Sequence, residues 1–137
     1  MFAGCVSKER RNELQTAVNE ISAKLPGQEL EISPIVLYVG GKKSNILQVQ
    51  YVSATNPSKF EELFSQNGTL YKEFTVIIKV IGSTYKGEYD QIEITALPKN
   101  YTGSDSMTYP LDKKKVQEVL ATPDGQLIKY AAAEYYK

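Results

Sequence analysis

The first periodic pattern in the chain lies between Ser7 and Leu25, where apolar residues recur at intervals of three and four. They are Leu14, Ala17, Val18, Ile21 and Leu25. Charged residues occupy most of the first turns, so the pattern predicts an amphipathic helix with one apolar face. Pro26-Gly27 should end this helix, because proline removes a backbone donor and glycine permits a left-handed turn.

Two strand patterns follow, over residues 30–39 and 47–52. Up to Pro34 apolar and polar residues alternate, whereas the segment from Ile35 to Val39 is apolar on both faces. A change of pattern at a proline indicates a bulge or an edge strand. The glycines and polar residues of 40–45 are turn formers, so the two runs predict a first hairpin.

A helix is predicted from Asn56-Pro57, because asparagine caps helices and proline fits their first position. Asn67-Gly68 should close it. The longest strand pattern comes next, from Leu70 to Ile81. One face of this strand would carry Leu70, Phe74, Val76, Ile78 and Val80. With the alternation around Ile92 and Ile94 it predicts a second hairpin, whose first strand lies inside the sheet.

The last third of the chain carries weaker signals. Residues 99–110 have no period and predict a surface loop. A short helical stripe follows Asp112 at Val116, Val119 and Leu120. Thr122-Pro123-Asp124 is typical of a helix start, which predicts a final helix through Leu127, Ile128, Ala131 and Tyr135.

These elements predict an α+β fold. The sheet should have four antiparallel strands in two hairpins, with an N-terminal helix on its apolar face, a helix between the hairpins and one or two C-terminal helices. Residues 1–7 would form a flexible tether and residues 8–137 a single domain. The expected core includes Leu14, Val18, Ile21, Phe74, Val76, Ile78, Ile92 and Ile94.

Composition narrows the chemistry. The chain has no His and one Cys, which excludes Ser-His-Asp and Cys-His catalysis, His-ligated metals and any disulfide within the chain. Sixteen basic residues balance sixteen acidic ones. Nucleic acid is therefore not an expected partner, and Lys113-Lys114-Lys115 predicts a solvated helix face beside Asp112 and Glu118.

Three patterns resemble familiar sites without meeting their chemical requirements. Gly40-Gly41-Lys42-Lys43-Ser44 lacks the spacing and the following helix of a phosphate-binding loop. Glu88 and Asp90 share a strand face but lie beside a turn, where water keeps carboxylates ionised. The segment from Gly103 to Ser106 has too few oxygen ligands for calcium. No cofactor and no metal are expected.

The single cysteine has a distinctive context. Phe2-Ala3-Gly4-Cys5 resembles the lipobox of bacterial lipoproteins, with Phe2 where the family most often has Leu. The resemblance implies that Cys5 carries a lipid and anchors the following domain to a membrane. Because Val6 is not Asp, it further implies sorting to the outer membrane, facing the periplasm.

Tyrosine is the other compositional signal, with ten Tyr against four Phe and no Trp. Four tyrosines fall in or beside predicted loops: Tyr85, Tyr89, Tyr101 and Tyr109. A tyrosine ring combines a large apolar face with a polar tip, which suits contact surfaces. We expect these four to line a partner-binding strip.

Three classes of function stay open at this point. The first is a non-catalytic envelope lipoprotein domain that binds a protein partner or assists an envelope assembly. The second is a cytosolic or phage-encoded interaction domain without lipid. The third is a cystatin-like or nuclear-transport-factor-like carrier of a small ligand, or an enzyme that uses carboxylates. The identity of the partner and the oligomeric state are left open by the sequence.

Overall fold

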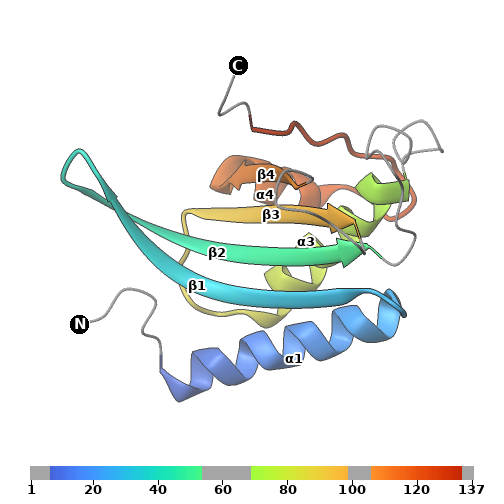
Figure 1. Ribbon diagram of the computed structural model, residues 1–137, viewed down its shortest axis with the longest axis horizontal. Helices are drawn as coiled ribbons and strands as arrows, with labels where there is room; N and C mark the ends of the chain where they lie inside the picture. Colours follow the sequence, from blue (N-terminus) through green and yellow to red (C-terminus); the bar gives the residue numbers. More distant parts are fainter. Residues whose placement is uncertain (1–6, 54–68, 99–105, 134–137) are drawn as a thin grey trace.

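The computed structural model describes residues 7–53, 69–98 and 106–133. Its elements are α1 (Lys8–Lys24), β1 (Glu29–Val39), β2 (Lys42–Ser53), α3 (Thr69–Thr84), β3 (Gln91–Pro98), β4 (Met107–Asp112) and α4 (Lys113–Ala121). The four strands form one sheet in the order β1-β2-β3-β4, as Figure 1 shows. The predicted α+β fold is confirmed, with an N-terminal helix, a helix between two hairpins and a C-terminal helix.

The sheet is mixed, whereas the sequence predicted antiparallel pairing throughout. β1 pairs with β2 and β3 with β4 in antiparallel fashion, but β2 and β3 run parallel. The parallel pair follows from α3, because a connection through a helix returns the chain to the same end of the sheet. The second hairpin is therefore β3 with β4, and residues 107–110 belong to a strand instead of a loop.

α1 follows its predicted pattern closely. The Ser7 hydroxyl caps the helix by accepting a hydrogen bond from the Arg10 backbone N–H at 3.2 Å. Leu14, Ala17 and Ile21 are buried on the face toward the core. The helix ends at Lys24, and Gly27 takes a positive φ of 85° in the turn that leads to β1.

The first hairpin also follows its prediction. Gly40 and Gly41 have φ values of 59° and 79° between the paired residues Val39 and Lys42. Two consecutive positive φ values define the tight turn whose twist matches a hairpin, and glycine adopts them without strain. β1 lies at the edge of the sheet, in agreement with the expectation from Pro34.

The strand predicted from Leu70 to Ile81 is wrong, because this segment is the helix α3. Its fully buried residues are Leu70, Phe74, Ile77, Ile78 and Ile81. Their spacing of four, three, one and three is that of one helix face. The positions 70, 74 and 78 fit both a period of two and a period of four, and the many β-branched residues favoured the strand. The predicted helix at 56–68 lies outside the described residues.

The final helix predicted from Thr122 is also absent from the described part of this segment. Gly125 has a φ of 92°, which a right-handed helix does not accommodate. The chain instead runs without helix or strand through residue 133, and it buries Ile128 and Tyr130 at a spacing of two. The Ala133 N–H donates to the Thr108 carbonyl of β4 at 2.7 Å. The short helix predicted after Asp112 is confirmed as α4.

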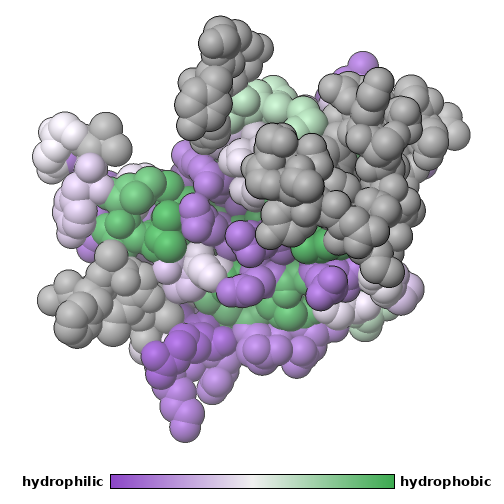
Figure 2. Space-filling model, in the orientation of Figure 1, coloured by the Kyte–Doolittle hydropathy of each residue, from purple (hydrophilic) through white to green (hydrophobic). Residues whose placement is uncertain are grey.

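The sheet has one apolar and one polar face. Rows of paired residues such as Ile32, Val49, Ile94 and Tyr109 face the helices and enter the core, together with α3. The opposite face carries Gln48, Gln50, Glu93 and Thr95, and Figure 2 shows polar side chains across its middle. Of the predicted core residues only Val18 and Val76 are half-buried; the other six are buried.

Replacing Ile78 by alanine should lower the free energy of unfolding by about 2 to 5 kcal/mol, because this fully buried side chain would leave a cavity beneath α3. Denaturant unfolding monitored by circular dichroism measures the change. Lys72→Ala, at an exposed position of the same helix, should change stability by less than about 0.5 kcal/mol. Equal effects of the two variants would contradict the placement of α3.

Candidate functional site

Three of the four tyrosines predicted to line a partner-binding strip are buried. Tyr85, Tyr89 and Tyr109 expose only 6%, 9% and 1% of their surface. The Tyr85 and Tyr89 rings lie 6.3 Å apart, with the Lys113 ammonium 3.8 Å from the centre of the Tyr89 ring. The Tyr109 ring packs on Phe74 at 4.8 Å. The expectation of an exposed strip is corrected for these three, whereas Tyr101 and Cys5 lie outside the described residues.

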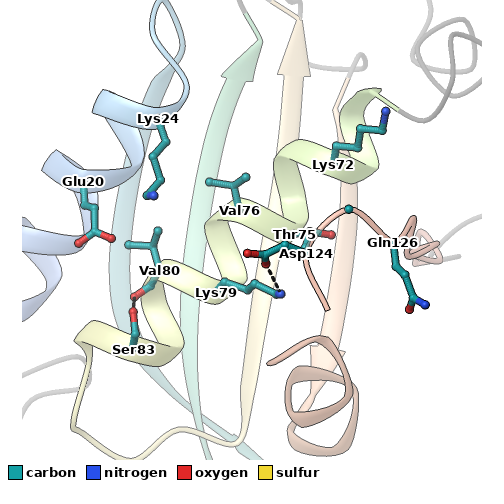
Figure 3. Close-up of a pocket in the computed structure, with 11 residues that line it drawn as sticks. Glu20, Lys24, Lys72, Thr75, Val76, Lys79, Val80, Ser83, Asp124 and Gln126 are labelled. Atoms are coloured by element: carbon teal, nitrogen blue, oxygen red, sulfur yellow. Dashed lines mark hydrogen bonds and ion pairs between the residues drawn. The ribbon is translucent and has the colours of Figure 1, made fainter. Parts of the chain in front are cut away.

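A groove of about 560 Å³ runs between α1, α3 and the turn after α4. Val76 and Val80 of α3 face Glu20 and Lys24 of α1 across it, as Figure 3 shows. We call it the α1–α3 groove. The remaining side chains that line it are Lys72, Thr75, Lys79, Ser83, Asp124 and Gln126.

Two of the charged side chains that line the α1–α3 groove, Lys79 and Asp124, form an ion pair. The Lys79 ammonium donates to the Thr122 carbonyl at 2.6 Å and to the Asp124 carboxylate at 2.7 Å. Its hydrogen bond and charge, together with the charge of Lys24, hold the pKa of Asp124 below the usual value. Lys72 points away from this pair in Figure 3, so the three lysines do not converge on one anion.

A second groove, of about 310 Å³, lies between α1 and β1. We call it the α1–β1 groove. Leu14 and Val18 of α1 face Leu30, Ile32 and Pro34 of β1 across it. Its polar lining consists of Arg11, Gln15, Glu31 and Ser33. The groove is therefore apolar at its floor and polar along both sides.

The α1–β1 groove runs along an open edge of the sheet. Among the described residues no strand pairs with the outer side of β1. An edge strand of this kind presents unpaired N–H and C=O groups to any extended chain beside it. Proline is tolerated in an edge strand when its nitrogen lies on the unpaired side. Backbone groups alternate between the two sides of a strand, so the N–H and C=O groups of Leu30 and Ile32, at even spacing from Pro34, also point to the unpaired side.

One carboxylate that the sequence analysis missed lies partly buried. Glu73 of α3 accepts a hydrogen bond from the Gln28 side chain at 3.1 Å and lies beside the buried Tyr51 hydroxyl. Burial raises the pKa of Glu73 above its usual value, and burial together with the Glu73 charge raises that of Tyr51. Glu73 was missed because the segment was predicted to be a strand, in which alternation places this residue on the outer face of the sheet.

Glu88 and Asp90, the carboxylates considered from the sequence, lie outside the strands, in the segment between α3 and β3. The Asp90 carboxylate accepts a hydrogen bond from the Asn45 backbone N–H at 2.8 Å and holds the base of the first hairpin, whereas Glu88 is exposed. Within residues 7–53, 69–98 and 106–133 no group of three or more Cys, Asp and Glu side chains is placed to hold a metal ion. None of the helices described is long and apolar enough to cross a membrane.

No protein-family model, curated protein or solved structure gives a significant match to this chain. The two grooves and the surface around them are therefore the features that bear on its function.

Replacing Glu73 by glutamine should raise the free energy of unfolding at neutral pH, because burial disfavours the charged form of the Glu73 carboxylate. In the wild type the folded pKa exceeds the unfolded one, so folding binds a proton. Stability should rise as the pH falls through the raised pKa toward the usual glutamate value near 4.5. Thermal unfolding between pH 4 and 8 measures this.

The matched control for Glu73→Gln is Glu29→Gln, which removes the same charge from an exposed position. It should keep the pH profile of the wild type. If Glu73→Gln and Glu29→Gln have the same stability at neutral pH, burial of Glu73 does not have the effect described.

Proposed function

We propose that this chain is a non-catalytic binding domain of the bacterial cell envelope, which takes up an extended segment of a partner protein at the edge of β1. The observation that carries the proposal is the coincidence of the open β1 edge with the α1–β1 groove. Addition of a strand to a sheet edge is a common mode of peptide recognition. The absence of His from the chain supports a role in binding over one in acid and base catalysis.

The chemistry of the edge defines the segment it would accept. Main-chain hydrogen bonds to residues 29–33 would give affinity, and Pro34, which lacks an N–H, would limit the paired length. Side chains on one face of the added strand would enter the groove between Val18 and Ile32, so they should be small and apolar. Those on the other face would lie beside Glu29 and Glu31, which favours Lys or Arg there.

A lipid on Cys5 would fix the location of this domain. Val6 alone separates Cys5 from Ser7, the cap of α1, so a lipid there would lie within about 7 Å of chain length from the helix start. The lipobox resemblance supports an outer membrane location facing the periplasm. A cytoplasmic interaction domain without lipid is the alternative, and it would use the same edge.

The small-ligand carrier is the second candidate, and the α1–α3 groove favours it. Its floor is apolar and its volume of about 560 Å³ is that of a small-molecule site. The space between sheet and helices that this class would use is filled by Phe74 and the aromatic rings around it. A carrier would therefore bind its ligand between the helices.

A peptide of alternating Val and Lys residues tests the β1 edge. Its addition to ¹⁵N-labelled protein should shift the amide signals of residues 29–33 and of the facing side of α1. The same peptide with methylated amide nitrogens should bind at least about tenfold more weakly, because it cannot donate to the edge. Shifts confined to other elements, or equal binding of both peptides, would contradict the proposal.

Charge reversal refines the same test. Glu31→Lys should weaken binding of the Val-Lys peptide by roughly three- to tenfold through repulsion across the new strand pair. Glu118→Lys reverses the same charge at an exposed position on α4 and should leave the affinity unchanged. A carrier function would instead be indicated by a small molecule that remains bound in native mass spectra and is lost in Val76→Lys.

The lipid is tested separately. In bacterial cells that express the full-length gene, a labelled fatty acid should be incorporated into the wild-type protein and not into Cys5→Ala. Ser7→Ala removes a hydroxyl close by and should keep the label. Equal labelling of wild type and Cys5→Ala would contradict the anchor without bearing on the β1 edge.

A further inference from the structure

The first hairpin extends beyond the rest of the sheet. β3 accompanies β2 only from Ile46 onward, so the last four pairs of the hairpin, from Val36 with Asn45 to Val39 with Lys42, have no third strand beside them. We call residues 36–45 the arm. Figure 1 shows it projecting from one end of the molecule. Asp90 holds its base through the Asn45 N–H and C=O groups at 2.8 and 2.7 Å.

The first strand of the arm carries apolar side chains that no other described element covers. A strand segment apolar on both faces is typical of a position buried on both faces. Here Leu37 exposes 45% and Tyr38 68% of their surface, on opposite faces of the strand. Figure 2 shows the hydrophobic residues of this region gathered where the arm leaves the sheet. Apolar groups left in water in this way indicate a contact surface.

Two lysines complete the chemistry of the tip. Lys42 and Lys43 are exposed, and they pair in the hairpin with Val39 and Tyr38. Lysine beside tyrosine and aliphatic residues is the composition of segments that lie at the interface of a lipid bilayer. There the ring and aliphatic groups enter the headgroup region, and the ammonium groups stay among the phosphates.

The direction of the arm agrees with this composition. Figure 1 shows the first turn of α1 at the same end of the molecule as the arm. That turn carries the exposed residues Lys8 and Arg11 against one exposed carboxylate, Glu9. A bilayer at this end would meet the arm and the cationic start of α1, and the α1–β1 groove would run away from it.

We infer that the tip of the arm, Leu37 and Tyr38 with Lys42 and Lys43, is a membrane-contact element that lies in the interface of an anionic lipid bilayer. The occupant is a lipid surface because the apolar tip and the ammonium groups together match acyl chains beside phosphate headgroups. The inference deepens the proposed function and rests on it, since a lipid on Cys5 would hold the tip of the arm close to a bilayer surface.

The test uses the full chain coupled through the thiol of Cys5, its only cysteine, to maleimide lipids in vesicles. The chain has no Trp, so Tyr38→Trp supplies a single indole at the tip. On vesicles that contain phosphatidylglycerol, its emission should shift to the blue by about 10 nm or more and should be quenched by brominated lipid. Leu127→Trp, at a position 48% exposed outside the arm, should show neither effect.

A second variant tests the charge. Lys42→Glu with Lys43→Glu in the Tyr38→Trp chain should remove most of the blue shift, whereas Lys114→Glu with Lys129→Glu, a matched change at exposed positions outside the arm, should preserve it. Coupling through Cys5 supplies the tether artificially, so this result does not depend on lipidation in cells. Failure of the fatty-acid labelling and failure of the arm are therefore distinguishable.

Two results would overturn the inference. One is that the Tyr38→Trp chain, like the Leu127→Trp chain, shows no blue shift and no quenching by brominated lipid. The other is a concentration-dependent dimer without vesicles that Leu37→Ser with Tyr38→Ser abolishes, which would assign the arm to a second copy of the chain. Sedimentation velocity distinguishes this outcome, and Leu120→Ser with Leu127→Ser is its matched control because those residues are 41% and 48% exposed.

Discussion

Burial of the apolar stripe of α3 against the sheet sets the path of the chain. Phe74 lies at the centre of this contact, with the rings of Tyr51, Tyr109 and Tyr130 at centroid distances of 6.4, 4.8 and 5.6 Å. These rings come from β2, β4 and the C-terminal segment, so one helical side chain joins segments far apart in sequence. Because α3 has to cross one face of the sheet to reach this position, β2 and β3 run parallel and the opposite face is left polar.

The two edges of the sheet differ as a consequence. β4 receives a backbone hydrogen bond from Ala133 of the C-terminal segment, which Ile128 and Tyr130 anchor in the core. No strand pairs with the outer side of β1 among the described residues. α1 runs beside it but packs mainly against α3, which leaves the α1–β1 groove along the unpaired edge. Natural sheets usually block an open edge, and Pro34 does so here at one point only. This asymmetry is why we place partner binding at β1.

The abundance of tyrosine has a structural explanation for the rings that the structure describes. Most of them fill the core as phenylalanine would, and Tyr130 also places its hydroxyl against a polar group. The Tyr130 hydroxyl lies 2.7 Å from the Thr75 hydroxyl, and Thr75 in turn donates to the Tyr71 carbonyl. Burial raises the pKa of Tyr130 to about 12, so this hydroxyl stays protonated at physiological pH. Tyr38 is different, because its ring projects from the arm into solvent.

The sequence by itself determined the elements whose hydrogen bonds and apolar pattern are local. α1, the glycine turn of the first hairpin and α4 follow from residues within a few positions of one another. Tertiary structure decided the rest. Positions 70, 74 and 78 suit a strand or a helix equally, and only packing of Ile77 and Ile81 against the sheet and the other helices selects the helix. Asp124 bonds to Lys79 of α3 instead of capping a helix of its own. The two candidate surfaces, an unpaired edge and an apolar arm without neighbours, depend on which segments lie beside β1, and a local pattern carries no information about that.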